Sequence, residues 1–350
     1  MYDGTWGKKS KFGNLIWQNV IFLRSIINNL LLFKYFFKGD IMVAPLHVQN
    51  ELKYGLEINK VYNEDCLVGM KKIKDKSIDM ILCDLPYGTT QNKWDSIIPL
   101  YDYIEIEIKN KIVCMNENEY KLYCFENNIS IEIFKIKWKE QSRKGLWTHY
   151  KRIIKDDGAI ILTATQPFAS LLIESNLDMF KYDWIWEKDQ GSNFLNVKNE
   201  PLKKHENILV FSKGTIANKS LRRMNYNPQG LIPCEIKKTN ENKRKKDGFI
   251  GERDNFKGEY QQKFKNYPST ILKYQRDRGL HPTQKPIELF EYLIRTYSNE
   301  DDIVLDNCMG SGTTAIASIK SNRKFIGFEN DKTHGYYDTI IKRIKEYQNV

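Results

Sequence analysis

The sequence has no pair of cysteines at the spacing of a metal site or of a small disulfide scaffold. Its six cysteines are scattered over 350 residues, mostly inside apolar runs, and no two of them form a C-x-x-C pair. Zinc ribbons and disulfide-rich secreted domains depend on such pairs. We therefore expect reduced thiols, a cytoplasmic protein and no bound metal.

Uninterrupted hydrophobic runs are also missing. The most apolar stretch, residues 15–37, is broken by Arg24, Lys34 and several Asn and Gln side chains. A membrane-spanning helix needs roughly 20 mostly apolar residues, and no small-residue cleavage site of a signal peptide follows the stretch. These absences argue against a membrane protein, and residues 1–48 are predicted to form a helical extension.

In one segment, acidic residues do not balance the basic ones. Residues 213–278, called the basic segment below, contain 17 Lys and Arg but seven Asp and Glu, and this excess of ten accounts for nearly all of the chain's net charge of +11. Such a segment suits contact with the phosphates of a nucleic acid, while a solvated loop is the alternative. The candidate nucleic-acid contacts are Arg222, Arg223, Lys243, Arg244, Lys245 and Lys246.

A short acidic motif follows the apolar run at residues 78–83. The run predicts a buried strand, and Asp84-Leu85-Pro86-Tyr87 would lie at its carboxyl end, where ligands bind in open α/β sheets. The Asp84 carboxylate and the Leu85 carbonyl could accept the two hydrogens of an exocyclic amine, and Tyr87 could stack on the ring that carries it. For this tetrapeptide alone, an ordinary Asp-x-Pro turn is the alternative.

A glycine-rich turn follows a second apolar run. Residues 303–306 predict a buried strand, and residues 307–314, called the glycine turn below, predict a turn that opens a helix and presents backbone N–H groups to a ligand. No Lys follows its glycines, which excludes a Walker phosphate loop. A third strand, residues 324–329, ends in Glu329, where such folds bind ribose hydroxyls. These features indicate a nucleoside site, with a plain βαβ unit as the alternative.

These stretches together resemble a known enzyme family. Asp84-Leu85-Pro86-Tyr87 resembles the Asp-Pro-Pro-Tyr catalytic motif of the β group of DNA adenine-N6/cytosine-N4 methyltransferases, and residues 306–314 resemble their Asp-x-Phe-x-Gly-Ser-Gly-Thr-Thr cofactor motif. His281-Pro282-Thr283-Gln284-Lys285-Pro286 matches a further segment of that family. The likeness covers residues 54–99 and 146–350. It departs from the pattern at Leu85, where the family has Pro, but that position acts through its carbonyl, so we expect little effect.

The resemblance implies an α/β fold: a doubly wound, mostly parallel, Rossmann-like sheet with an antiparallel edge, in circularly permuted order with the catalytic motif before the cofactor motif. The expected parts are the extension (1–48), a catalytic half (49–212) with a β-rich insertion at 101–143, the basic segment as target-recognition region (213–278), and a cofactor-binding half (279–350). Within the insertion, alternating apolar residues predict strands at 103–108 and 130–137.

The resemblance also implies S-adenosyl-L-methionine as cofactor. The glycine turn would receive its methionine part, Glu329 its ribose and Asp65 its adenine, although Asp65 also fits a helix cap. Thr283 and Lys285 would contact the cofactor's carboxylate. The expected cofactor-binding residues are Asp65, Cys66, Thr283, Lys285, Asp306, Gly310, Ser311, Gly312, Thr313, Thr314, Glu329 and Asn330, and the expected catalytic residues are Asp84, Leu85, Pro86 and Tyr87.

The expected reaction is methyl transfer to N6 of an adenine flipped out of double-stranded DNA, because in the family Asp at the first motif position goes mostly with adenine. The alternatives are N4 of cytosine, an amino group of RNA or protein, and a nucleic-acid-binding protein without activity. Intact Asp84, Tyr87, Gly310 and Gly312 argue against the last of these. The resemblance leaves open a homodimer and a cognate restriction endonuclease.

Overall fold

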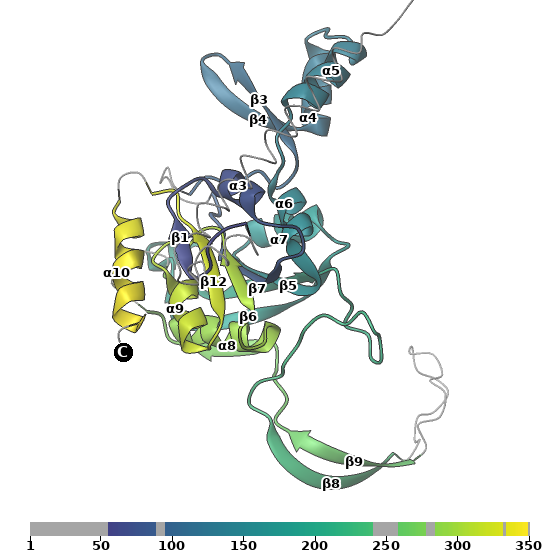
Figure 1. Cartoon of the computed structure of the whole chain (residues 1–350), viewed down its shortest axis with the longest axis vertical. Helices are drawn as coiled ribbons and strands as arrows, with labels where there is room; N and C mark the ends of the chain where they lie inside the picture. Colours follow the sequence, from purple (N-terminus) through teal and green to yellow (C-terminus); the bar gives the residue numbers. More distant parts are fainter. Residues whose placement is uncertain (1–54, 89–94, 241–257, 278–283, 332–333, 349–350) are drawn as a thin grey trace, which may run out of the picture. The chain divides into compact units, whose positions relative to one another are not determined.

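Strand β2 (Ile78–Asp84), which ends in the first residue of the acidic tetrapeptide, lies inside an eight-stranded sheet. The computed structural model describes residues 55–88, 95–240, 258–277, 284–331 and 334–348 (Figure 1). The expected extension at 1–48, the lysines and arginine at 243–246, and Thr283 lie outside these residues. The strand order across the sheet is β1-β12-β11-β2-β5-β7-β6-β10.

The sheet is mostly parallel, as predicted. Its other strands are β1 (Lys60–Tyr62), β5 (Ile154–Ala164), β6 (Phe180–Ser192), β7 (Lys203–Ser212), β10 (Ile271–Tyr274), β11 (Ile303–Asp306) and β12 (Lys324–Phe328). Only β7 runs antiparallel to its neighbours β5 and β6. We expected the antiparallel strand at the edge, and this was wrong, because β10 pairs in parallel with the outer side of β6 and forms the edge itself.

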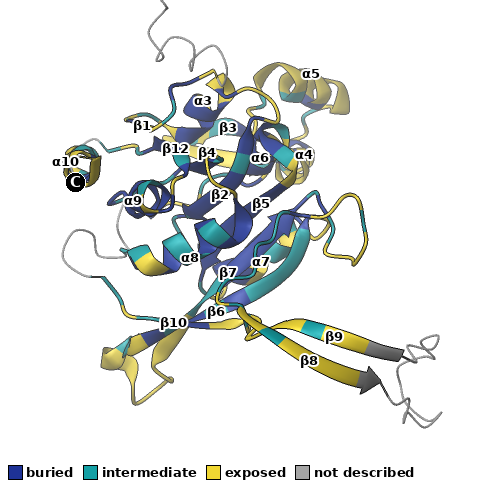
Figure 2. Cartoon of the chain, turned by 60° about the horizontal axis from the view of Figure 1, so that its bottom comes forward, coloured by how far each residue is buried: buried dark blue, intermediate teal, exposed yellow. Residues whose placement is uncertain are grey.

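Alternate residues of β2 belong to two different hydrophobic cores. Ile81 and Cys83 pack in a core that includes residues of α6 (Leu146–Ile153) and α7 (Phe168–Ser175), whereas Met80 and Leu82 pack in a core that includes α8 (Ile287–Tyr297). Successive side chains of a strand point to opposite faces, so both faces of the sheet are covered (Figure 2). Parallel sheets require this, and the doubly wound fold is confirmed.

The remaining elements complete the outer layers of this sheet. Helix α9 (Thr313–Lys320) and helix α10 (Tyr336–Gln348) form a third core with β1 and β12. The short elements are α3 (Cys66–Gly69) and the 3₁₀ turns η1 (Met70–Lys72) and η2 (Phe194–Asn196). In the part of the chain that the structure describes, no helix combines the length and the apolar character needed to cross a membrane.

The two strands that carry the motifs are distant in the sequence but adjacent in the sheet. Strand β11 pairs in parallel with β2, with Val304 opposite Met80 and Leu305 opposite Ile81. Parallel strands end at the same edge, so the residues that follow them face one crevice. The acidic tetrapeptide follows β2 and the glycine turn follows β11, which comes later in the chain. This is the permuted order that we expected.

The insertion at 101–143 is half helical. Its first predicted strand is confirmed as β3 (Tyr103–Ile108), which forms a hairpin with β4 (Lys111–Asn116). Two helices follow, α4 (Glu117–Glu126) and α5 (Ile131–Gln141), so the strand predicted at 130–137 was wrong.

Helix α5 forms because its aromatic residues have helical spacing. Phe134 and Trp138, four residues apart, both pack on Tyr120 of α4. Ser130 caps the helix through its side chain, which accepts from the Ile133 N–H. The alternating Ile residues that suggested a strand are left on the exposed side of the helix. Packing of the aromatic residues thus outweighed the alternating pattern.

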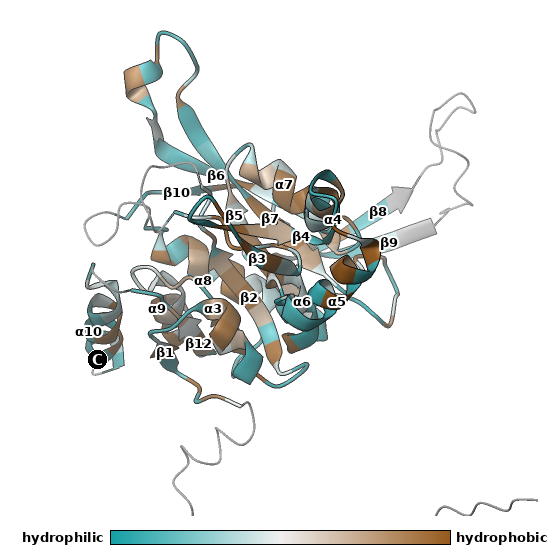
Figure 3. Ribbon diagram, turned by 90° about the horizontal axis from the view of Figure 1, so that it is seen from above, coloured by the Kyte–Doolittle hydropathy of each residue, from teal (hydrophilic) through white to brown (hydrophobic). Residues whose placement is uncertain are grey.

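The basic segment contains a separate two-stranded antiparallel sheet, called the ribbon below. Its strands are β8 (Ile232–Asn240) and β9 (Gly258–Lys265). Figure 2 shows most of the ribbon as exposed, and Figure 3 shows β8 as hydrophilic. The ribbon therefore contributes little to the hydrophobic cores, in contrast to the strands of the main sheet.

Candidate active site

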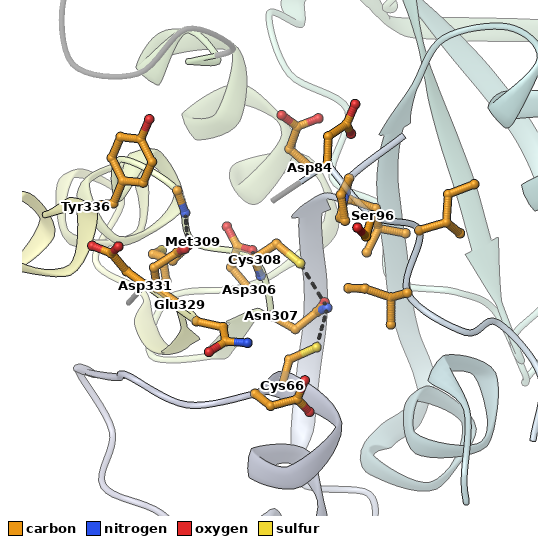
Figure 4. Close-up of a pocket in the computed structure, with 18 of the residues that line it drawn as sticks. Cys66, Asp84, Ser96, Asp306, Asn307, Cys308, Met309, Glu329, Asp331 and Tyr336 are labelled. Atoms are coloured by element: carbon orange, nitrogen blue, oxygen red, sulfur yellow. Dashed lines mark hydrogen bonds between the residues drawn. The ribbon is translucent and has the colours of Figure 1, made fainter. Parts of the chain in front are cut away.

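One cavity of about 720 Å³ opens beside the carboxyl ends of β2 and β11 (Figure 4). Its size is that of a pocket for a small molecule or cofactor. Predicted site residues that line it are Asp65, Cys66, Asp84, Leu85, Pro86, Tyr87, Lys285, Asp306, Gly310, Ser311, Thr313, Thr314, Glu329 and Asn330. The acidic tetrapeptide and the glycine turn, identified separately in the sequence, are thus walls of the same cavity.

Asp84 is contacted on both oxygens of its carboxylate. Oδ1 accepts hydrogen bonds from the hydroxyls of Tyr87 (2.6 Å) and Thr163, and Oδ2 lies 2.5 Å from Lys285 Nζ. Thr163 is the direct neighbour of Asp84 across the β2–β5 pairing, so the register of the sheet produces that contact. A carboxylate has about four lone-pair sites. With three filled, one remains for a further donor.

Tyr87 is held by its hydroxyl, its ring and its backbone. The ring lies 5.6 Å from that of Phe168, centroid to centroid, and 5.7 Å from Lys285 Nζ. Asp95 Oδ1 accepts from the N–H groups of Tyr87 (2.7 Å) and Gly88 (3.0 Å). Burial, and then the negative charge of Asp84, raises the pKa of Tyr87 well above its usual value. The hydroxyl therefore stays protonated and donates to Asp84.

Asp306 determines the shape of the glycine turn. The residue is 2% exposed, and its two oxygens accept from the Cys308 N–H (2.9 Å) and the Thr314 hydroxyl (2.5 Å). Burial raises the pKa of Asp306 to about 6, although these hydrogen bonds favour the ionised form. The carboxylate joins the end of β11 to the first turn of α9.

Two glycines give the turn a backbone that other residues rarely adopt. Gly310 has φ +55° and Gly312 has φ +85°. A Cβ on Gly312 would lie 3.1 Å from Cγ2 of Ile340, a residue of α10. Gly312 caps helix α9, whose first N–H groups and dipole favour a negative group. The turn therefore exposes backbone, rather than side chains, to a ligand.

Glu329 follows the next strand, β12, and contacts the same turn. Its Oε2 accepts from the Gly310 N–H at 2.7 Å. Burial, followed by the nearby carboxylates of Asp306 and Asp331, raises the pKa of Glu329 to about 7. This acid therefore changes charge near neutral pH, at the place where a ribose is expected.

Asp65 is both a helix cap and a cavity residue. Its Oδ1 accepts from the N–H groups of Leu67 (2.9 Å) and Val68 (3.1 Å). The helix cap, which the sequence offered as the alternative role of Asp65, is therefore present. The contact of Asp65 with adenine stays a prediction. Beside it, the Asn307 amide lies 3.6 Å from the sulfur of Cys66 and 3.4 Å from that of Cys308 (Figure 4).

Lys285 points at the acidic tetrapeptide. Besides its contact with Asp84, its Nζ lies 3.5 Å from Glu206 Oε2. The contact expected between Lys285 and the carboxylate of the cofactor stays a prediction.

The residues that sequence reasoning missed include Asp95 and Asn307, which line the cavity, and Thr163 and Glu206, which contact Asp84 and Lys285. Thr163 and Glu206 reach the site through strand pairing, and Asp95 through a loop, so no spacing in the sequence indicates them. Asn307 lies inside the glycine turn, and its position between two cysteines became visible only in the structure.

The arginine pair of the basic segment does not line the cavity. Arg222 and Arg223 are exposed in the loop between β7 and β8. This loop is anchored by Met224, a buried residue whose N–H donates to the Thr215 carbonyl at 3.0 Å. The two arginines therefore extend from an ordered loop into solvent.

A family model described as "DNA methylase", N6_N4_Mtase, matches residues 78–342. The chain belongs to the N6/N4 DNA methylase family. Type II methyltransferase M.HindIII of Haemophilus influenzae is 27% identical over 324 residues, which cover 82% of this DNA methylase and 95% of that protein. The DNA adenine methyltransferase YhdJ of Escherichia coli is 27% identical over 286 residues, 79% of this chain and 80% of that protein.

Solved structures of similar proteins include the M1.HpyAVI–SAM complex, with a TM-score of 0.43, 20% identity, and coverage of 81% of this chain and 98% of that one. PvuII DNA methyltransferase (cytosine-N4-specific) has a TM-score of 0.48, 15% identity, and coverage of 83% and 91%. Because both scores are below 0.5, the fold assignment depends on the strand order and register of this DNA methylase itself.

As a member of this family, the DNA methylase acts on DNA and uses S-adenosylmethionine as methyl donor. The cavity fits that cofactor chemically, because it combines a glycine turn with exposed backbone, a helix N-terminus and the half-buried carboxylate of Glu329. Glu329, Asp65 and the glycine turn are the residues that would hold it.

Proposed function

We propose that this DNA methylase transfers a methyl group to the N6 amine of adenine in double-stranded DNA. The observation that carries the proposal is that the acidic tetrapeptide and the glycine turn line one cavity, at the ends of the adjacent parallel strands β2 and β11. A target base held by the first and a cofactor held by the second would be brought together by the sheet. Positioning of this kind supplies much of the rate of a methyl transfer.

Two acceptors would hold the target amine. Asp84 has one lone-pair site left after its three protein donors. The carbonyl of Leu85 is the second acceptor, and the following Pro86 favours an extended backbone at Leu85. With both hydrogens accepted, the lone pair of the nitrogen is free to attack. S-adenosylmethionine, when bound, supplies an electrophilic methyl group, and no covalent enzyme intermediate is required.

The target base would be flipped out of the duplex to reach Asp84. Flipping costs a few kcal/mol, and stacking on an aromatic ring recovers about 1–3 kcal/mol per base. Tyr87 lines the cavity and is fixed by Phe168 and Asp95. It is therefore our candidate for the ring on which the flipped base stacks.

Adenine is preferred because the tetrapeptide begins with Asp84. In the family that this motif resembles, Asp at the first position goes mostly with adenine and Ser with cytosine N4. The relative YhdJ of Escherichia coli, 27% identical, is named a DNA adenine methyltransferase. Both points support adenine, and N4 of cytosine is the alternative that the experiment below separates from it.

The basic segment is the part that would contact DNA outside the cavity. The ribbon exposes Lys237, Lys238, Lys263 and Lys265, and the preceding loop exposes Arg222 and Arg223. Two-stranded β ribbons fit the major groove of DNA. We propose that residues 213–278 select the target site between a catalytic half (49–212) and a cofactor half (279–350).

A homodimer and a cognate restriction endonuclease stay predictions. The Haemophilus influenzae relative is named a Type II methyltransferase, which supports a restriction–modification setting for this chain.

The proposal is tested by nucleoside mass spectrometry on unmethylated duplex DNA incubated with the protein and S-adenosylmethionine. We expect N6-methyladenine. N4-methylcytosine would overturn the choice of base, and the absence of any methylated base would overturn the proposed reaction. Asp84→Ala should abolish the product, because it removes the main acceptor. Asp178→Ala, at an exposed position outside the cavity, should leave it unchanged.

A further inference from the structure

Four side chains of alternating charge, called the charge row below, connect the carboxylate of Asp84 at the end of β2 to strands β7 and β6. Lys285 Nζ lies 2.5 Å from Asp84 Oδ2 and 3.5 Å from Glu206 Oε2, and Glu206 Oε1 lies 2.6 Å from Lys188 Nζ. The side chains of Lys285, Glu206 and Lys188 are 5%, 11% and 8% exposed. The row is thus a buried ionic network that reaches β6 and β7.

Glu206 and Lys285 are held in their charged forms by their neighbours in the row. Burial alone would raise the pKa of Glu206, but the two lysines outweigh it and the pKa is lowered. Burial alone would lower the pKa of Lys285, but Asp84 and Glu206 outweigh it and the pKa is raised. Removing one charge would leave its neighbour buried without compensation. The position of each charge therefore depends on the next.

The row ends on the oxygen of Asp84 that no other described residue contacts. Tyr87 and Thr163 both donate to Oδ1, whereas Lys285 is the donor on Oδ2. Without Lys285 in place, the carboxylate would be held at one oxygen and could turn about its bond to Cβ. One lone-pair site of Asp84 is left for an amine. The direction in which this lone pair points depends on where the Lys285 ammonium lies.

Glu206 is the second acid that contacts the Lys285 ammonium, besides Asp84. It lies on β7, and the sheet places it opposite Trp186, two residues from Lys188. Lys188 is fixed in turn, since its Nζ lies 5.5 Å from the Trp186 ring. Glu206 Oε2 has no hydrogen-bond partner among the described groups, so its contact with Lys285 is an ion pair that depends on its charge.

We propose that Glu206, anchored by Lys188, is a positioning residue that holds Lys285 against Oδ2 of Asp84 and so orients the carboxylate toward the target amine. This inference rests on the proposed function, because it assumes that Asp84 receives the amine. Glu206 does not line the cavity, so it acts on the reaction only through Lys285 and Asp84.

The test compares Glu206→Gln with wild type in single-turnover reactions with methyl-labelled S-adenosylmethionine and unmethylated plasmid DNA. We expect the rate at saturating DNA and cofactor to fall about 10- to 100-fold, as for other displacements of a reacting group by about 1 Å. The dissociation constants for DNA and cofactor should change less than twofold. A purely structural role would lower the melting temperature but leave the rate of the folded fraction unchanged.

Glu187→Gln is the matched control. Glu187 is on β6 next to Lys188, and pairs with Lys273 (3.1 Å) and Lys204 (3.9 Å) on the surface, away from the cavity. This variant also removes a paired acid, and its rate should remain that of wild type.

A second variant keeps the inference testable if Glu206→Gln does not fold. Lys188→Met leaves Glu206 with Lys285 as its only partner in the row, which should draw the ammonium away from Asp84 and lower the rate. Where both single variants fold, adding Glu206→Gln to Lys188→Met should cost less than the sum of the two changes. Additive losses, or a wild-type rate in either single variant, would overturn the inference.

Failure of the inference differs from failure of the proposed function. An active wild type together with an unaffected Glu206→Gln would reject the positioning role and leave the reaction intact. A wild type that methylates no DNA would reject the function first.

Discussion

The charged residues of the charge row and those of the ribbon follow opposite rules. Lys188, Glu206 and Lys285 are almost completely buried, and each has an oppositely charged neighbour within 3.5 Å. The ribbon lysines, Lys237, Lys238, Lys263 and Lys265, are exposed, and none pairs with an acid in the described parts of the chain. Burial requires pairing, because an unpaired charge is costly away from water.

This difference separates two ways of using charge. In the row, the position of each charged group is fixed by its oppositely charged neighbour, so the network can orient a reacting group. In the ribbon, the lysine ammonium groups remain hydrated, so folding carries no desolvation penalty for them. They are therefore available to the phosphates of DNA. Removing a buried charge should therefore affect stability and chemistry, whereas removing exposed ones should affect DNA affinity alone.

The largest effect is expected from Asp306→Ala in the glycine turn. The change leaves the Cys308 N–H and the Thr314 hydroxyl without their acceptor, and each buried donor left unsatisfied costs about 1–3 kcal/mol. We expect a lower melting temperature and a cofactor affinity reduced more than about tenfold, since about 1.4 kcal/mol is a factor of ten. Calorimetry measures both. An unchanged cofactor affinity would show that the turn does not depend on Asp306.

The next effect tests the role of the exposed ribbon lysines in DNA binding. Replacing the four ribbon lysines by Gln should reduce the slope of log affinity against log salt by about 0.9 for each phosphate that the protein no longer neutralises. The melting temperature should not change. Replacing four exposed lysines of the insertion, Lys121, Lys135, Lys137 and Lys139, is the control of equal charge. If the two variants weaken DNA binding equally, net charge rather than the ribbon is responsible.

A smaller effect comes from Glu329, whose pKa is raised to about 7. The ionised form accepts from ribose hydroxyls, and the protonated form has one acceptor fewer. Cofactor affinity should therefore fall as the pH drops from 8 to 6, by about tenfold for a group that must be ionised. Glu329→Gln should bind more weakly at pH 8 and show little change between these values. A wild-type affinity that is constant from pH 8 to 6 would remove Glu329 from the ribose site.

The last effect concerns folding stability and involves His149 of α6, a buried residue outside the cavity. Neither ring nitrogen has a hydrogen-bond partner among the described groups, and burial, then Arg152 and Lys71, lowers its pKa from 6.5 to about 4. Between these values the unfolded chain takes up a proton that the folded protein does not. Stability should be complete above pH 6.5 and decrease toward pH 4, by up to about 1.4 kcal/mol per pH unit.

Thermal melts of wild type and His149→Phe from pH 7 to 5 check this. The wild type should lose stability relative to the variant on acidification. Parallel curves for the two proteins would mean that His149 is accessible to protons in the folded state.

Much of the sheet could be predicted because its signals are local. The apolar runs at 78–83 and 303–306 are long enough and close enough to turn residues to be read as strands, and they became β2 and β11. The insertion could not be read in this way, because the residues of α5 alternate like a strand while its packing uses Phe134 and Trp138. Only the packing of these two aromatic residues on Tyr120 of α4 makes the segment a helix rather than a strand.

The sequence by itself determined the motifs: the acid, carbonyl and ring at residues 84–87, the glycines of the turn, and the acid at 329, because each is a requirement on residue type at a local spacing. Tertiary structure alone decided that Thr163, Glu206 and Lys188 act together with Asp84. Those contacts arise from the pairing of β2 with β5 and of β6 with β7. Strand pairing joins residues at separations that no local pattern encodes, and burial then requires their charges to match.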